Sequence, residues 1–262
     1  MKISKLLLLM STPLLLASCG EKNSTSSGEE SESHQGYVDD EPKETKISRL
    51  VSLIDNIKEA SSGRVISQSE YETHSGEDVN SGVTETIYQI HGFKTKYTTT
   101  GVSAQGYEYY SNVDYESATY TSVIVQNGTV IQHGTYNVPQ EQWDIYQMEL
   151  YNPANSNSFI WSLCAVMNPV IKNMDDLYDH NDAYHEYCFK EYDYVNNDVL
   201  GTASVHLSSL KFKYDDNEKK YIISYAGRST IDETTYSIAN VTLTIWDLNN
   251  VADFELPENP NA

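Results

Sequence analysis

Arginine is scarce in this 262-residue chain, and basic side chains as a whole are outnumbered. The three arginines are Arg49, Arg64 and Arg228, and Lys and Arg together number 17 against 38 Asp and Glu, which gives a formal net charge of −21. A protein that binds nucleic acid needs a basic face to replace the counterions of the phosphates. The composition therefore excludes nucleic acid as a partner, and it argues against electrostatic docking on anionic lipid head groups.

Motifs of catalysis and of zinc binding are also missing. The three cysteines, Cys19, Cys164 and Cys188, form no Cys-x-x-Cys pair. The glycine-containing stretch 101–106, "GVSAQG", misses the GxSxG nucleophile pattern by one position. We therefore expect a protein that is not an enzyme and holds no cofactor. A glycosidase-type pair of carboxylates stays an unsupported alternative, because acidic residues are plentiful.

Long apolar runs are absent outside the first residues of the chain. Lys2 and Lys5 precede a stretch from Leu6 to Ala17 that is apolar except at Ser11, Thr12 and Pro13. This stretch is shorter than the roughly 20 residues that span a bilayer. Its length and its positive start are typical of a secretory signal, so residues 1–18 are predicted to be a signal peptide.

The end of this leader resembles the lipobox of bacterial lipoproteins. Leu16-Ala17-Ser18-Cys19 is followed by Gly20, with small residues before the cysteine. The resemblance implies that the Cys19 thiol receives a diacylglycerol, that the chain is cut before it, and that Cys19 becomes the first mature residue. Two acyl chains are enough for stable anchoring. The implied location is extracytoplasmic, with the protein lipid-anchored to a bacterial membrane or cell surface.

The stretch that follows, residues 19–43, is rich in Ser, Glu, Asp and Gly. Such a composition cannot bury enough apolar surface to offset the entropy of ordering, so we predict a disordered tether. As a flexible coil it would hold the folded part on the order of 25 to 30 Å from the membrane. Loss of Lys2 and Lys5 with the leader leaves 15 basic residues against 38 acidic ones.

Periodicity predicts the elements of the remaining chain, residues 44–262, which we expect to form a single domain. Ile47, Leu50, Val51, Ile54 and Ile57 recur at helical spacing and predict one amphipathic helix. Alternation of apolar and polar residues then predicts antiparallel strands. The expected strands are 64–74, 83–91, 94–99, 107–112, 118–126, 129–137, 183–192, 203–214, 221–229 and 234–246, with turns at 75–82 and at Asn127-Gly128.

An apolar helical zone interrupts the strands. Residues 140–150 and the run "NSFIWSLCAVMNPVIKNMDDLY" at 157–178 are expected to form short helices, with Pro169 dividing the second segment into two. The predicted architecture is therefore α+β. It has an N-terminal helix, an antiparallel sheet, and short helices inserted in the middle of the chain.

This order of elements resembles that of LolA and LppX, lipid carriers with a half-barrel fold. The resembling pieces are "KISRLVSLIDNIKEASSGRVISQSEYET", a helix running into a strand, and the final "NVTLTIWDLNNVADFELPEN". The resemblance implies a strongly curved sheet covered on one face by helices, with acyl chains in the gap between them. The heavy use of tyrosine, 21 Tyr against 5 Phe, departs from a purely apolar cavity.

The helical zone supplies the candidate ligand-binding residues. If the half-barrel resemblance holds, they line the cavity or form its lid, whereas the alternative is an ordinary filled core. The residues are Phe159, Ile160, Trp161, Leu163, Val166, Met167, Val170 and Ile171.

Two weaker candidates involve metal and disulfide chemistry. Asp179, His180, Asp182 and His185 lie within "DDLYDHNDAYHE" and carry oxygen and imidazole ligands, but their spacing matches neither an EF-hand nor HExxH. A solvated loop is the competing interpretation. Cys164 and Cys188 are far enough apart to form a disulfide, which an extracytoplasmic compartment favours, although buried cysteines often act as small apolar residues.

Two functional hypotheses follow for what we expect to be a monomer. The first is a membrane-tethered carrier that binds a lipid or another apolar ligand in the half-barrel. The second is a cell-surface module, with a solid core, that binds a protein or a glycan. A vacant apolar cavity under the helices would favour the first, and a filled core with an exposed binding face would favour the second.

Lipidation gives the first testable prediction. When the chain is made in a bacterial host that processes lipoproteins, we expect mass spectrometry to find acyl chains on Cys19 and the protein to fractionate with membranes. Cys19→Ala removes the thiol that is acylated, so the variant should leave the membrane fraction. An unacylated wild-type protein, with Cys19→Ala still bound to the membrane, would contradict the prediction.

Overall fold

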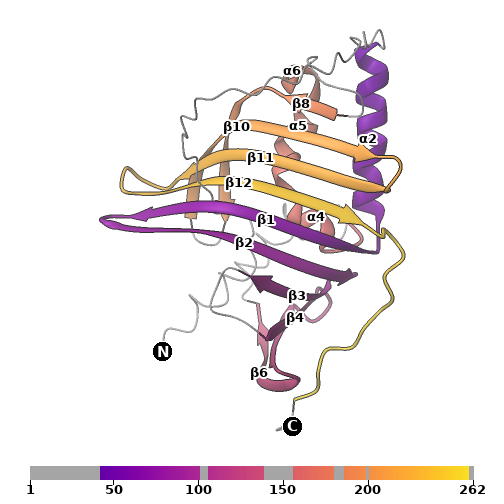
Figure 1. Ribbon diagram of the computed structural model, residues 1–262, viewed down its shortest axis with the longest axis vertical. Helices are drawn as coiled ribbons and strands as arrows, with labels where there is room; N and C mark the ends of the chain where they lie inside the picture. Colours follow the sequence, from indigo (N-terminus) through magenta and orange to yellow (C-terminus); the bar gives the residue numbers. More distant parts are fainter. Residues whose placement is uncertain (1–41, 101–105, 139–155, 180–185, 199–200, 260–262) are drawn as a thin grey trace, which may run out of the picture.

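The computed structural model describes residues 42–100, 106–138, 156–179, 186–198 and 201–259. Within them the chain forms a twelve-stranded, mostly antiparallel sheet with an N-terminal helix and short helices between the sixth and seventh strands (Figure 1). The α+β class and the order of these elements are confirmed. The predicted signal peptide, Cys19 and nearly all of the predicted tether lie outside the described residues, as does the predicted helix at 140–150.

The first half of the sheet follows the N-terminal helix. The bounds are α2 Lys43–Glu59, β1 Ser62–Ser75, β2 Asp78–His91, β3 Lys94–Thr100, β4 Tyr107–Asp114, β5 Thr119–Gln126 and β6 Thr129–Asn137. The turn predicted at 75–82 is wrong in its length. Ser75 pairs with Asp78, so the loop has two residues, and Gly76 adopts the positive φ of 64° that such a turn requires. The mainly polar residues 78–82 after this turn belong to strand β2. Backbone pairing with β1 holds them in the sheet although they lack apolar alternation.

The helical zone is more finely divided than predicted. Its bounds are α4 Ile160–Leu163, the 3₁₀ helix η2 Ala165–Met167, α5 Asn168–Lys172 and α6 Met174–Leu177. Pro169 lies next to a boundary between two helices, as predicted, because η2 ends at Met167 and α5 begins at Asn168. It lies in the first turn of α5, where its missing N–H has no intrahelical partner to lose.

The second half of the sheet returns after the helices. Its bounds are β7 Tyr178–Asp179, β8 Glu186–Phe189, β9 Tyr192–Asp198, β10 Gly201–Asp215, β11 Lys220–Thr230 and β12 Thr235–Trp246. The single strand predicted at 183–192 is wrong. The chain breaks into β8 and β9 because β10 is long enough to pair with both, β8 opposite its second half and β9 opposite its first half.

The two halves join through the first and last strands. The strand order is β6-β5-β4-β3-β2-β1-β12-β11-β10-β8-β7, with β9 beside β10. The sheet is open, since β6 and β7 end it on opposite sides, and it is not strongly curled (Figure 1). The expected strongly curved half-barrel is therefore wrong. Strong curling requires repeated bulges or glycine kinks, and the β1–β12 ladder runs through twelve residue pairs without one.

One face of the sheet carries the core. Helix α2 buries Leu50, Ile54 and Ile57 against it, as the helical spacing predicted, whereas Val51 from the same predicted set is exposed. The short helices α4 and α5 lie behind strands β10 to β12 in Figure 1, with α6 above β10 near β8, and their buried residues belong to the same core. Alternate strand residues complete this core, among them Val65, Leu210, Phe212, Ile223, Leu243 and Ile245.

The opposite face of the same strands is open and carries mainly polar side chains, because successive residues of a strand point to opposite sides. We call it the open face. No described helix has the length and apolar character needed to cross a membrane.

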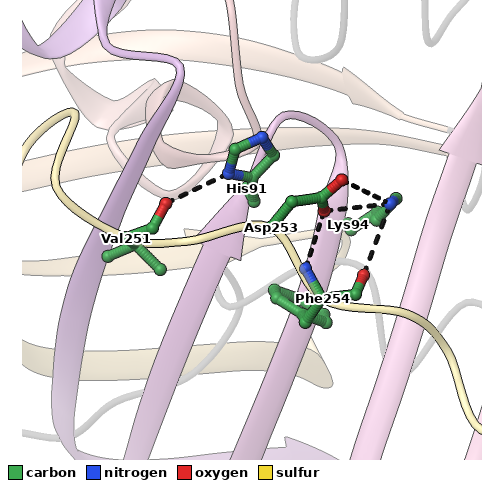
Figure 2. A network of polar contacts seen from close by, with 5 residues as sticks. All are labelled: His91, Lys94, Val251, Asp253 and Phe254. Carbon is green, nitrogen blue, oxygen red and sulfur yellow. Dashed lines mark hydrogen bonds and ion pairs between the residues drawn. The ribbon is translucent and has the colours of Figure 1, made fainter.

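The C-terminal segment is tied along the ends of β1 to β3 (Figure 2). The His91 ring donates from Nδ1 to the Val251 carbonyl at 3.1 Å. Lys94 Nζ donates to both carboxylate oxygens of Asp253, at 2.9 and 3.0 Å, and to the Phe254 carbonyl at 3.3 Å. Val251 is buried. These contacts keep the end of the chain on the sheet although it forms no strand.

The two faces of β12 predict opposite effects of neighbouring substitutions. Leu243 is 1 % exposed in the core, so Leu243→Ala should lower the free energy of unfolding by about 2–5 kcal/mol. Thr244→Ala, one residue away on the open face, should cost less than about 1 kcal/mol. Denaturant unfolding of both variants tests this, and equal losses would show that the assignment of faces is wrong.

The C-terminal contacts predict a pH-dependent local stability. The hydrogen bond from Lys94, and after it that from the Phe254 N–H, lowers the pKa of Asp253 from its ordinary 3.8. The ionised carboxylate therefore stabilises the segment above the ordinary pKa, and this stability is lost as pH falls through the lowered pKa. Asp253→Asn should speed amide exchange at residues 248–254 near neutral pH, with little change in global unfolding because the pair is half exposed.

The matched control for this experiment is Glu255→Gln, which removes a neighbouring exposed carboxylate. Its exchange rates should equal those of the wild type. The difference between wild type and Asp253→Asn should vanish in acid, and a difference that persists there would contradict the role given to the ionised carboxylate.

Candidate functional site

The predicted ligand-binding residues of the helical zone lie in the core. Ile160, Trp161, Leu163, Val166, Met167 and Val170 are 0–2 % exposed, Phe159 is 9 % exposed, and Ile171 is partly buried against them. A side chain that lines a vacant cavity exposes surface to a water-sized probe, and these side chains expose almost none. The structure therefore favours a filled core for this zone over a ligand cavity lined by these residues.

The two described cysteines are not joined by a disulfide. Cys164 is fully buried in the core, and burial raises the pKa of its thiol, so the group stays protonated. Cys188 lies on the other side of the sheet, because its neighbours Tyr187 and Phe189 point into the core. Its thiol donates to Glu186 at 3.7 Å. The disulfide that the sequence left as a possibility is thus not present, since the sheet separates the two side chains.

The weak metal candidate cannot be assembled from the described residues. Asp179 ends β7, and His180, Asp182 and His185 lie outside the described part of the chain. Among the residues that the structure places, no group of three His, Cys, Asp or Glu side chains could hold a metal ion.

Tyrosine residues line the face of β2 to β4 on the helix side. The ring centroids of Tyr88 and Tyr97 are 5.2 Å apart, and those of Tyr97 and Tyr109 are 5.0 Å apart, in a row across the three strands. Burial raises the pKa of Tyr88 and Tyr97, so both stay neutral. These rings act mainly as packing groups that hold neighbouring strands together.

A hollow of about 450 Å³ lies on the open face, on the side of the sheet away from the helices. It crosses five strands, from β2 through β1, β12 and β11 to β10. Hydroxyl, amide and charged groups supply most of its lining side chains. The lining residues are Gln68, Ser69, Glu70, Val83, Ser209, Lys211, Ser224, Tyr225, Ala226, Asn240, Val241 and Thr242.

The depth of the hollow comes from small side chains on adjacent strands. Ser209 is paired with Ala226, and Ala226 with Asn240, while Ser224 faces Thr242 in the next row. The Ser224 and Thr242 hydroxyls are hydrogen bonded at 3.2 Å. Short side chains in both rows leave a floor close to the backbone, which longer residues surround.

Hydrogen-bonded side-chain pairs lie on two sides of this floor, an ion pair on one side and an amide–carboxylate pair on the other. Lys211 donates to Glu186 at 2.8 Å, and this hydrogen bond lowers the pKa of Glu186 and raises that of Lys211. On the other side, Gln68 donates to Glu85 at 2.9 Å. Both members of the Lys211–Glu186 pair are therefore ionised near neutral pH.

The chemistry of the hollow is suited to binding. Its carboxylate Glu70 is exposed to water. The lining side chains offer both donors and acceptors to a polar ligand. The arrangement can recognise hydroxyl-bearing groups.

A second group of side chains continues the open face beyond the hollow. The guanidinium of Arg228 on β11 lies 3.9 Å from the ring centroid of Tyr236 on β12. The His74 ring on β1 stacks on the same tyrosine at 4.2 Å, and His74 is paired with Glu72. We call Arg228, Tyr236 and His74 the arginine stack. Sequence reasoning missed it, because no local pattern says that β1, β12 and β11 are neighbours.

Comparisons with known proteins do not identify a function for this site. No known sequence family and no curated protein matches the chain, so the resemblance to LolA and LppX finds no support there. Among solved structures, the chain is similar to a DUF1329 family protein from Desulfovibrio piger. The similarity is 11% in identity, covers 76% of this chain and 91% of the other, and has a TM-score of 0.29. At that level it carries no argument about function.

Proposed function

We propose that this chain is a non-enzymatic bacterial lipoprotein, anchored outside the cytoplasm through acylated Cys19, that binds a saccharide on the open face of its sheet. The observation that carries the proposal is the hollow of about 450 Å³, bordered by hydroxyl, amide and charged side chains, on the face that the helices leave uncovered. This is the second of the two hypotheses that the sequence suggests, with the partner taken to be a glycan.

A saccharide is the ligand whose chemistry suits the hollow. Sugars present many hydroxyl groups that donate and accept hydrogen bonds. The Ser209, Ser224 and Thr242 hydroxyls do the same, and the amides of Gln68 and Asn240 provide separate donor and acceptor atoms. Water can bridge the contacts that a shallow site leaves unmade.

Burial in the helical zone argues against the lipid carrier. Such a carrier needs a largely apolar cavity that encloses its ligand. Trp161, Met167 and Val170, which would line it, are no more than 2 % exposed. Among the residues that line the hollow, Val83 is the one large apolar side chain that is exposed, at 66 %, which is too little for acyl chains.

Filling the hollow tests the proposal. Ala226→Trp places an indole on the floor between Ser209 and Asn240, and large aromatic residues are tolerated on strand surfaces. We expect the full chain in detergent micelles to bind at least one member of a saccharide panel. The variant should lose at least about tenfold in affinity for it by calorimetric titration, since the bound groups lose several hydrogen bonds.

Thr244→Trp is the control, because it adds the same indole to the open face at a residue that does not line the hollow. It should bind as the wild type does, and thermal unfolding should show that both variants are folded. If no saccharide binds, or if Ala226→Trp binds as well as the wild type, the proposed function is wrong.

A further inference from the structure

The geometry points to a carboxylate-bearing saccharide as the ligand class, with Arg228 as the residue that binds the carboxylate. This inference rests on the proposed function and adds to it the charge of the ligand and a specificity-determining residue outside the hollow.

Arg228 has a feature unusual for an arginine in so acidic a chain. It is exposed, and within the part of the chain that the structure describes its one interaction is the stack on Tyr236. By contrast, Arg64 on the same face lies 3.2 Å from the Asp247 carboxylate. With 38 acidic residues in the sequence, an arginine without a carboxylate retains all five of its N–H donors for a ligand.

The arginine stack holds this guanidinium in place. Because β12 lies between β11 and β1, Tyr236 is sandwiched between Arg228 on one side and His74 on the other. Glu72 in turn pairs with His74. A planar guanidinium fixed by stacking loses less freedom on binding, and its fork matches the two oxygens of a carboxylate.

The stack adjoins the hollow along the strands. Arg228 is two residues beyond Ala226 on the same face of β11, a spacing of roughly 7 Å. Its cross-strand partner His206 points to that face as well and donates to Asp193 at 2.9 Å. The Asp193 carboxylate on this face is therefore hydrogen bonded to His206. A saccharide in the hollow can thus place a carboxylate from a neighbouring ring on Arg228.

The charge of the chain limits how acidic the ligand can be. A polymer with a negative group on every residue would be repelled by a mature chain with 15 basic residues against 38 acidic ones, whereas repulsion beyond about 8 Å is largely screened at physiological ionic strength. The expected ligand therefore carries isolated carboxylates among neutral sugars. Its hydroxyls occupy the hollow, and one acid group lies on the arginine stack.

Matched saccharide pairs test this inference. In each pair one oligosaccharide contains a single uronic acid and the other has the corresponding neutral hexose. The full chain in detergent micelles should bind the acidic member of at least one pair about tenfold or more tightly than the neutral member. Arg228→Gln should remove that preference, and Arg228→Lys, which keeps the charge without the fork, should remove part of it. Arg64→Gln should leave the preference intact.

The outcomes separate this inference from the proposed function. Equal binding of the acidic and neutral members would overturn the inference, and so would a preference that survives in Arg228→Gln. In either case the proposed function still stands if saccharide binding is lost in Ala226→Trp. Inorganic phosphate that binds as tightly as the acidic saccharide would overturn the inference too, by showing an anion site without a role for the hollow. Failure of every saccharide to bind overturns both.

Discussion

Pairing between β1 and β12 is the interaction on which the rest of the structure depends. Twelve residue pairs, from Arg64 with Trp246 to Ser75 with Thr235, join the beginning and the end of the fold. Strands β2 to β6 continue from one partner and β11 to β7 from the other. Without this ladder the two halves would be separate meanders, each with an unpaired edge exposed at the centre.

The ladder also sets the faces of the sheet. The pairing of β1 with β12 and of β12 with β11 has no register shift, so alternate residues of all three strands face the helices. Val65, Leu243 and Ile223 therefore meet α2 and the short helices in one core. The same register brings the residues between them together on the open face, so that small side chains from distant parts of the chain become neighbours.

The open face combines two features that a single strand does not have. The hollow needs short side chains on β10, β11 and β12 at the same level. The arginine stack needs three planar groups on successive strands. Each is a cross-strand arrangement whose geometry is fixed by strand spacing. Many sets of apolar side chains could fill the core on the buried face, by contrast, and this core holds the open face in position.

The sequence by itself determined the helix that buries Leu50 and Ile54, most of the strands, and which residues of each strand share a face, because these depend on local periodicity. Strand neighbours were decided only in the tertiary structure, since alternation is the same whichever strand lies alongside. The absence of strong curling, the separation of Cys164 from Cys188, and the approach of Arg228 to Tyr236 and His74 all follow from that long-range pairing. For the same reason, the helical residues 159–171 look alike in sequence whether they line a cavity or fill a core, and only packing against the sheet distinguishes the two.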